Sequence, residues 1–229
     1  MRTIKIIFAA LITLTLAACG STPQPTVSLK PEVLNAEKRI GIYFANVKAP
    51  TTNINGAYCL LCYGVASAAN ASLDKHLETL PIADLESTKE LVLEGYKKSS
   101  NNVSYIELSE NEVKKLKKFK GELGFAKKDF RPLKDSKNID VLVVVEYWAH
   151  GAYRLYDAYI PLTDPQGYVT GVVYSVDLND NQYIQYKKID KKVVVDGEWD
   201  EPSLNFPGVT SAYYQALEQT KESIKKIFL

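Results

Sequence analysis

The sequence is poor in the residues that build metal centres and catalytic sites. Only two histidines occur among 229 residues, and His76 and His150 lie far apart, neither with a cysteine or carboxylate at ligand spacing. We therefore expect no metal site and no cofactor. The chain also lacks a Gly-rich phosphate loop, a Gly-x-Ser-x-Gly elbow and a His-Glu-x-x-His helix, so several common enzyme signatures are absent.

Neither sign of charge is in large excess over the whole chain. Lys and Arg total 28 against 27 Asp and Glu, a net charge of +1, which argues against nucleic acid as a partner. Basic residues do outnumber acidic ones between Lys114 and Lys137. That stretch is either a solvated helix face and loop or a surface for anionic lipid headgroups, lipopolysaccharide or an acidic partner.

The one long apolar run lies at the N-terminus. A basic start at Arg2 and Lys5 leads into apolar residues at 6–16 and then into small residues ahead of Cys19. This pattern is typical of a signal peptide and predicts removal of residues 1–18. The alternative, a transmembrane helix over 4–18, is disfavoured because spanning needs roughly 20 apolar residues.

The end of this run, Leu16-Ala17-Ala18-Cys19-Gly20, resembles the bacterial lipobox. The resemblance implies that Cys19 is lipidated with diacylglycerol and palmitate-type chains, which makes the membrane the first partner. Two or three acyl chains anchor a protein stably where one does not. Because Gly20 rather than Asp follows the cysteine, the resemblance also implies an anchor in the outer membrane, with the domain facing the periplasm.

The rest of the chain predicts one domain. Residues 19–38 combine prolines with small polar residues, so we expect a lipidated cysteine followed by a flexible tether. Residues 39–229 show no internal linker and are enough for a single α/β domain.

Hydrophobic periodicity predicts the elements of that domain. The expected strands are 39–46, 103–108, 140–148, 153–162, 168–178 and 183–195, and the expected helices are 64–80, 84–98, one beginning after Ser109 and including Phe119, and one from 209 to 227. A loop is expected at 50–56 and turns at 164–167 and 178–181. Together they predict a mixed sheet of about five strands with helices packed on it, antiparallel hairpins in the C-terminal half and a closing C-terminal helix. The run Val141 to Val145 is apolar throughout and predicts a central strand buried on both faces.

The segments that define this order are Ile40–Phe44, Asp140–Glu146, Val172–Leu178 and the closing helix. It resembles the periplasmic lipoprotein domains typified by the curli secretion lipoprotein and by the lipoprotein activators of penicillin-binding proteins. The resemblance implies an assembly or interaction module in the envelope. The chain has no long membrane-inserting hairpins of the secretion-channel kind, so pore formation is not expected.

Cys59 and Cys62 form a Cys-Leu-Leu-Cys motif in a compartment that permits disulfides. Three interpretations stay open: a structural disulfide, buried free thiols, or thiol-redox chemistry. Redox chemistry would need a βαβ context and a neighbour that stabilises a thiolate. The segment Tyr58–Val65 instead has the composition of a buried one.

Candidate acid and base groups are Glu146, His150 and Asp157, near the end of the predicted central strand. Our main hypothesis is a non-enzymatic interaction or assembly module. The alternative is a periplasmic enzyme, either a hydrolase using Glu146 and His150 or a redox protein using Cys59 and Cys62.

Tyrosines are concentrated between Tyr147 and Tyr186, more than strand packing alone would require. We therefore predict a partner-binding surface formed by Tyr153, Arg154, Tyr156 and Tyr159. The expected partner is an envelope protein, a peptidoglycan-associated component, or a second copy of the chain.

Overall fold

The structure, a computed structural model, describes residues 22–229. The predicted signal peptide and Cys19 lie outside this range. Within it, no helix combines the length and the apolar character needed to cross a bilayer.

One mixed seven-stranded sheet organises the domain, in the order β3-β1-β4-β6-β7, with the short strands β2 and β5 both pairing with β4. The strands are β1 Arg39–Phe44, β2 Thr51–Asn55, β3 Asn102–Tyr105, β4 Val141–Asp157, β5 Ile160–Pro161, β6 Gln166–Asp177 and β7 Tyr183–Val194. β1 runs parallel to β3 and β4, whereas β4, β6 and β7 are antiparallel neighbours. The predicted α/β class and mixed sheet are confirmed, with more strands than the five expected.

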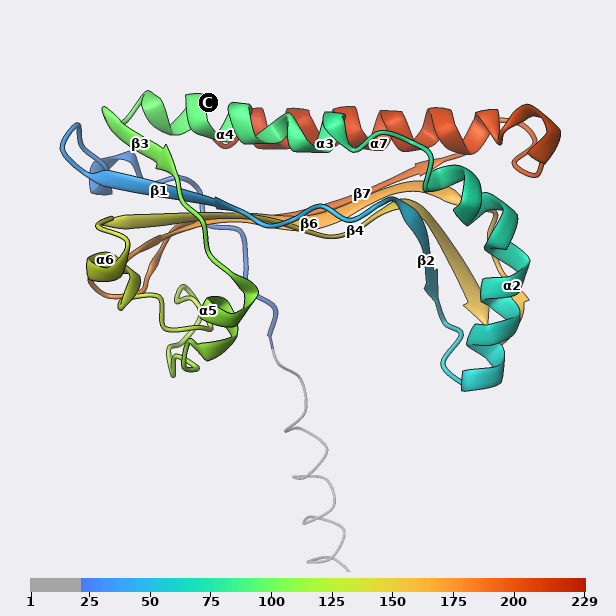
Figure 1. The fold of residues 1–229 in the computed structure, drawn as a ribbon, viewed down its shortest axis with the longest axis horizontal. Coiled ribbons are helices and arrows are strands. Elements are labelled where there is room, and N and C mark those ends of the chain that lie inside the picture. The colour runs from blue at the N-terminus through green and yellow to red at the C-terminus, as the bar shows by residue number, and fades with distance from the viewer. Residues whose placement is uncertain (1–21) are drawn as a thin grey trace, which may run out of the picture.

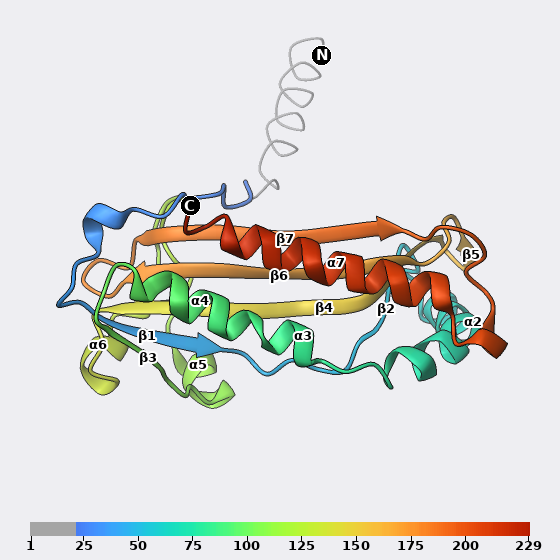
Figure 2. The ribbon, with the colours of Figure 1, turned by 90° about the horizontal axis from the view of Figure 1, so that it is seen from above.

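Helices cover one face of the sheet (Figures 1 and 2), where α4 and α7 lie side by side and run lengthwise along the strands. The helices are α2 Leu60–Leu77, α3 Ala83–Glu86, α4 Thr88–Lys97, α5 Glu110–Lys115, α6 Leu133–Ser136 and α7 Pro207–Lys225, with 3-10 turns η1 Pro31–Val33 and η2 Pro202–Leu204. The closing C-terminal helix is therefore confirmed as α7.

The main core lies between this helical layer and the sheet. Val141, Val143 and Val145 pack with Ile42 and Leu217 in one buried cluster. Leu142 and Val144 belong to a second cluster below the sheet, because successive side chains of a strand point to opposite faces. The prediction that this strand is central and buried on both faces is confirmed.

The structure corrects the strand boundaries around β4. The strand predicted at 140–148 and the first half of the one predicted at 153–162 form one 17-residue strand, which bends at a bulge between Tyr147 and Ala149 instead of ending there. The rest of the second prediction contains the separate short strand β5. Gly151 allows this bend, since its φ of +116° suits glycine and an added Cβ would lie 2.6 Å from the Thr51 carbonyl oxygen. β2 forms where a loop was expected, and Gln166 and Gly167 belong to β6 rather than to a turn.

The helix predictions need three corrections. α2 begins at Leu60 rather than at residue 64, and its N-terminal part buries Cys62, Ala66 and Asn70. The helix expected at 84–98 is divided at Ser87 into α3 and α4. The capping box of Ser109 and Glu112 is confirmed, but α5 ends at Lys115, so Phe119 lies outside it.

The described part of the predicted tether lies against the domain rather than standing away from it. Val27 and Tyr186 exchange two backbone hydrogen bonds of 2.9 Å along the edge of β7. Gln24 Oε1 accepts a hydrogen bond of 2.9 Å from the backbone N–H of Gly124, and Leu34 is buried in the main core. These hydrogen bonds and the burial of Leu34 outweigh the bias of the surrounding prolines toward a solvated segment.

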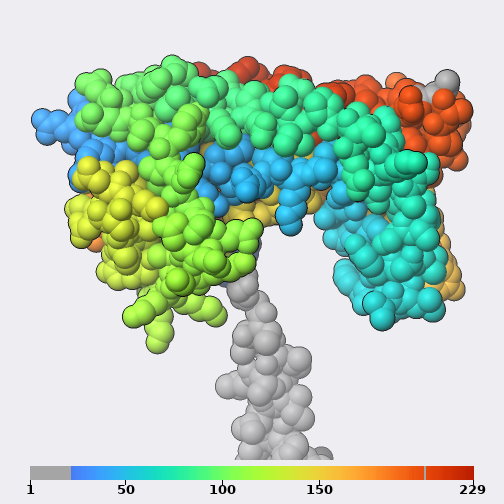
Figure 3. All heavy atoms as spheres, viewed as in Figure 1, coloured from blue at the N-terminus to red at the C-terminus, as the bar shows by residue number. Residues whose placement is uncertain are grey.

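The molecule has the shape of an arch (Figures 1 and 3), with the sheet and its helical layer as the span. One leg consists of α5, α6 and the loops around them. The other consists of β2, the bent ends of β4 and β6, and the start of α2. The start of the described chain lies on the same side of the sheet as both legs.

Candidate functional site

A groove of about 1170 Å³ lies beneath the span, between the two legs, and is visible as a hollow in Figure 3. Residues of β1 and β4 form its roof, α5 forms one wall, and β2 with Tyr63 forms the other. The lining is rich in aromatic side chains, namely Tyr43, Tyr63, Phe130, Trp148 and Tyr174, and its charged residues are Lys48, Glu110, Lys114 and Glu146. Trp148 and Tyr63 are half exposed, at 51% and 53%.

The groove follows an interruption in the sheet. The parallel ladder between β1 and β4 ends at the pair Phe44 and Val145, and the ladder between β2 and β4 starts at Thr51 and Gly151. After Ala45, whose backbone N–H still donates to the Val145 carbonyl oxygen at 2.9 Å, residues 46–50 leave the sheet, and the bulge in β4 falls in the same place. A stretch of the central strand therefore borders the groove.

Glu146 and Trp148 are two residues apart on β4, and both line the groove. Burial raises the pKa of Tyr43, and the nearby carboxylates of Glu146 and Glu110 raise it further. Burial likewise raises the pKa of Tyr174. Both phenols therefore stay neutral at physiological pH and can donate or accept hydrogen bonds.

His150 is committed to structural hydrogen bonds. Its Nε2 lies 2.7 Å from the Lys48 carbonyl oxygen and its Nδ1 lies 2.8 Å from the hydroxyl of Tyr213 on α7. A carbonyl only accepts, so Nε2 carries the proton and Nδ1 accepts from the tyrosine. Burial lowers the pKa of His150, which keeps the ring neutral.

The hydrolase hypothesis finds no support in this geometry. His150 also lines the groove, but both of its ring nitrogens are engaged by Tyr213 and the Lys48 carbonyl, so neither is free to act as a general base. Asp157 is exposed at the far end of β4. Within residues 22–229, no three His, Cys, Asp or Glu side chains gather as they would around a metal ion.

The four residues of the predicted partner surface do not share one surface. Arg154 is buried, with its guanidinium carbon 4.4 Å from the centre of the Trp199 ring, and it donates to Asn70 Oδ1 at 3.2 Å. Tyr156 is buried too, and its hydroxyl accepts from Asn70 Nδ2 at 2.7 Å. Tyr153 is half-buried, and only Tyr159 is largely exposed. The segment continues β4, so its side chains alternate between the two faces and α2 covers one of them.

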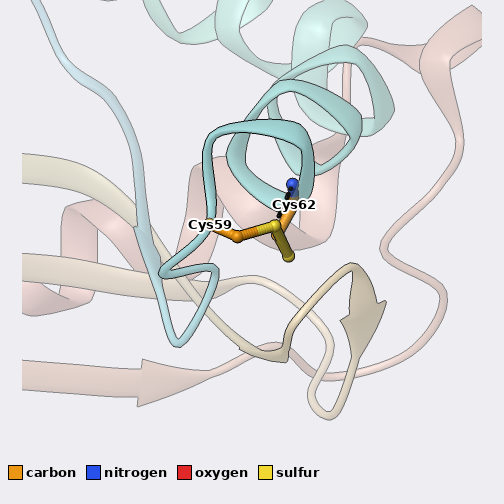
Figure 4. Close-up of a disulfide and its surroundings, with 2 residues drawn as sticks. All are labelled: Cys59 and Cys62. Atoms are coloured by element: carbon orange, nitrogen blue, oxygen red, sulfur yellow. Dashed lines mark hydrogen bonds between the residues drawn. A yellow bond between two sulfur atoms is a disulfide. The ribbon is translucent and has the colours of Figure 1, made fainter.

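Cys59 and Cys62 form a disulfide at the start of α2, with Cα atoms 5.0 Å apart (Figure 4). Cys59 is the N-cap, and its sulfur accepts a hydrogen bond of 2.9 Å from the Cys62 backbone N–H. Cys62 packs against Ala66 and Tyr156. The expectation that Tyr58–Val65 is a buried segment is wrong, because its large apolar side chains other than Cys62 are exposed.

Apart from Glu146 and His150, which were candidate acid and base groups, the groove residues were missed by sequence reasoning, although one signal was available. Glu146 and Trp148 alternate with the inward Val145 and Tyr147, so a polar and a large aromatic side chain share the second face of the central strand. Tyr43, Tyr63 and Tyr174 reach the groove from three other elements. No local pattern connects these segments.

Comparison with known proteins gives distant likenesses in structure only. No protein-family model matches the chain, and no curated protein matches its sequence. The PelC dodecamer from Paraburkholderia phytofirmans is 9% identical with a TM-score of 0.37, over 89% of this chain and 95% of that chain. A neuraminyllactose-binding hemagglutinin homolog from Helicobacter pylori is 12% identical with a TM-score of 0.31, over 90% and 91%. Likeness at this level leaves function to be argued from the groove.

Proposed function

We propose that the protein is a lipid-anchored module of the bacterial envelope that binds an extended segment of a partner protein in the groove, without catalysing a reaction. The observation that carries this proposal is the open aromatic groove beside an interrupted stretch of the central strand. A sheet with a missing stretch of neighbouring strand suits an extended chain, because main-chain pairing supplies affinity and side-chain pockets supply specificity.

The aromatic lining supports binding. Trp148 on β4 and Tyr63 on α2 both line the groove, and each leaves about half of its surface open to solvent. Tryptophan and tyrosine combine a large apolar area with a polar atom, which is why they dominate the energetics of many interfaces. The engagement of both His150 nitrogens supports a non-catalytic role.

The anchor is the second part of the proposal. Lipidation of Cys19 would hold the domain at the outer membrane, facing the periplasm, as the lipobox resemblance implies. The partner would then be another envelope protein or a peptidoglycan-associated protein. A second copy of this chain is the alternative occupant of the groove.

The groove is tested by removing its two half-exposed aromatic side chains together. The paired variant Trp148→Ala and Tyr63→Ala should keep its fold, since both side chains are half exposed, and should capture at least tenfold less partner. This loss corresponds to about 1.4 kcal/mol or more, the size expected of interface hot spots. The measurement is chemical cross-linking and co-purification from detergent-extracted envelopes, with the captured protein quantified.

The matched control is the pair Tyr105→Ala and Tyr159→Ala. Both tyrosines are exposed to a similar degree and neither lines the groove. Equal capture by the two paired variants would contradict a binding role for the groove.

A further inference from the structure

The start of α2 presents an unusual apolar surface, which we call the tip and define as Tyr58, Leu60, Leu61 and Val65. Tyr58 and Leu60 are 91% and 92% exposed, and Leu61 and Val65 are also exposed. Solvent-facing positions on a helix are normally polar, and clustered large apolar side chains mark an interaction surface.

The disulfide helps to hold the tip outward. Cys62 is fixed by its buried contacts with Ala66 and Tyr156, and the cross-link ties Cys59 to it. Leu60 and Leu61 lie between the two bonded residues in the chain, so the cross-link restricts the backbone that carries them. The exposure of these leucines is therefore built into the local structure.

The other leg ends in a basic loop on the same side of the sheet (Figure 1). Lys117, Lys118 and Lys120 are exposed there, and Leu123 is an exposed apolar residue beside them. Lysines next to an exposed apolar side chain suit the anionic interface of a bilayer.

The position of the predicted lipid anchor favours the membrane as the surface that contacts the tip and the basic loop. Gln24 is held by Gly124 in the basic loop, and Cys19 precedes Thr22 by three residues, which span at most about 11 Å when extended. The membrane end of the chain therefore emerges on the side of both legs (Figure 1).

We propose that the protein stands on the bilayer with both legs, and that the tip inserts Leu60, Leu61 and Tyr58 into the membrane interface while the basic loop contacts anionic headgroups. This inference rests on the proposed lipid anchor at Cys19. In this orientation the open side of the groove faces the bilayer, so a partner segment would enter the groove from the sides, between the legs.

The orientation is tested with tryptophan reporters in the full-length lipidated chain. Leu61→Trp probes the tip, Leu123→Trp probes the basic loop, and Leu229→Trp is the matched control, because Leu229 is 98% exposed at the C-terminus, on the side of the helical layer. Each variant is reconstituted into vesicles of phosphatidylethanolamine and phosphatidylglycerol with brominated acyl chains. The fluorescence of the parent chain, from Trp148 and Trp199, is subtracted.

We expect the added fluorescence at positions 61 and 123 to be quenched at least twofold more than at position 229 and to shift to shorter wavelength. If the chain stays on the vesicles but the tryptophan at position 61 is quenched no more than the one at position 229, the membrane orientation is refuted, and the groove proposal still stands. A concentration-dependent blue shift at position 61 without quenching would mean that a second copy covers the tip, which also overturns it. Failure of the chain to remain on vesicles at all would refute the anchor and the orientation together.

Discussion

His150 shows how one residue can have the chemistry of a catalytic group and the environment of a structural one. Its ring joins the Lys48 carbonyl, which follows β1, to Tyr213 on α7, so it links the segment that leaves the sheet to the helical layer. The stacked rings of His150 and Tyr213 have centroids 5.9 Å apart. This contact fixes the back of the groove.

The lowered pKa of His150 predicts a dependence of stability on pH. The unfolded chain takes up a proton on this residue below about pH 6.5, its ordinary pKa, whereas the folded form resists protonation because the ring is buried. The stabilisation is therefore complete above about pH 6.5 and is lost as the pH falls toward the folded pKa. Denaturation midpoints measured between pH 7 and pH 5 should decrease for the parent chain.

The variant His150→Gln should lower the free energy of unfolding at pH 7 by about 1–3 kcal/mol, since a buried partner is left unsatisfied. It should also lose less stability on acidification than the parent does. His76→Gln is the control, because His76 also has a pKa lowered by burial but is only half-buried, bonded to Thr210 at 2.8 Å. If His150→Gln loses as much stability on acidification as the parent chain does, the lowered pKa of His150 is not the cause of the pH dependence.

Among the elements, α2 carries the least expected combination of features. Its start holds a disulfide, an N-cap and the exposed tip, while its C-terminal part buries Leu73 and Leu77. Asp74 Oδ1 accepts a hydrogen bond of 2.6 Å from the Thr52 backbone N–H, which fixes the helix to β2. The element is thus attached firmly at one end and presents its other end to the surroundings.

The disulfide should contribute modestly to stability. It closes a very short loop, for which the chain-entropy relation gives about 2 kcal/mol. The variant with Cys59→Ser and Cys62→Ser should therefore fold and lose no more than this amount in urea denaturation. Serine is also a good N-cap, so the bond to the Cys62 position should survive.

A second variant separates the cross-link from the cap. Cys59→Ala combined with Cys62→Ser removes both and should cost about 1 kcal/mol more than the double serine variant. Failure of the double serine variant to fold would show that the cross-link is essential to α2. Loss of partner capture with an unchanged fold would instead favour the redox hypothesis.

At the scale of the whole molecule, the arch places its groove, its two legs and the start of the described chain on one side and its helical layer on the other (Figure 1). The bent β4 produces this shape, since it crosses the full span and pairs with β1 at one end and β2 at the other. A membrane anchor on the side of the legs would turn the legs and the groove toward the bilayer and the helical layer away from it.

The anchor itself predicts a defined mature N-terminus. Mass spectrometry of the protein purified from envelopes should find residues 1–18 removed and Cys19 carrying acyl chains. The variant Cys19→Ser should be neither acylated nor processed. A mature protein that begins at Met1, or one without lipid, would contradict the anchor and with it the proposed orientation on the membrane.

Local patterns in the sequence determined the class of fold and most of its elements. Five consecutive apolar residues predicted the central strand, the spacing of Val209, Tyr213 and Leu217 predicted α7, and Ser109 with Glu112 predicted the start of α5. These predictions succeeded because strand burial, helix amphipathicity and capping depend on neighbours within a few positions.

Only the tertiary structure decided which side chains are buried and where a ligand can bind. Arg154 and Tyr156 look like surface residues in sequence, but α2 covers them, and Leu60 and Leu61 look buried but face outward. Tyr43, Trp148 and Tyr174 come together because β1, β4 and β6 are neighbours in one sheet. These contacts depend on the pairing of distant strands and on the bend at Gly151, and neither can be predicted from the spacing of residues along the chain.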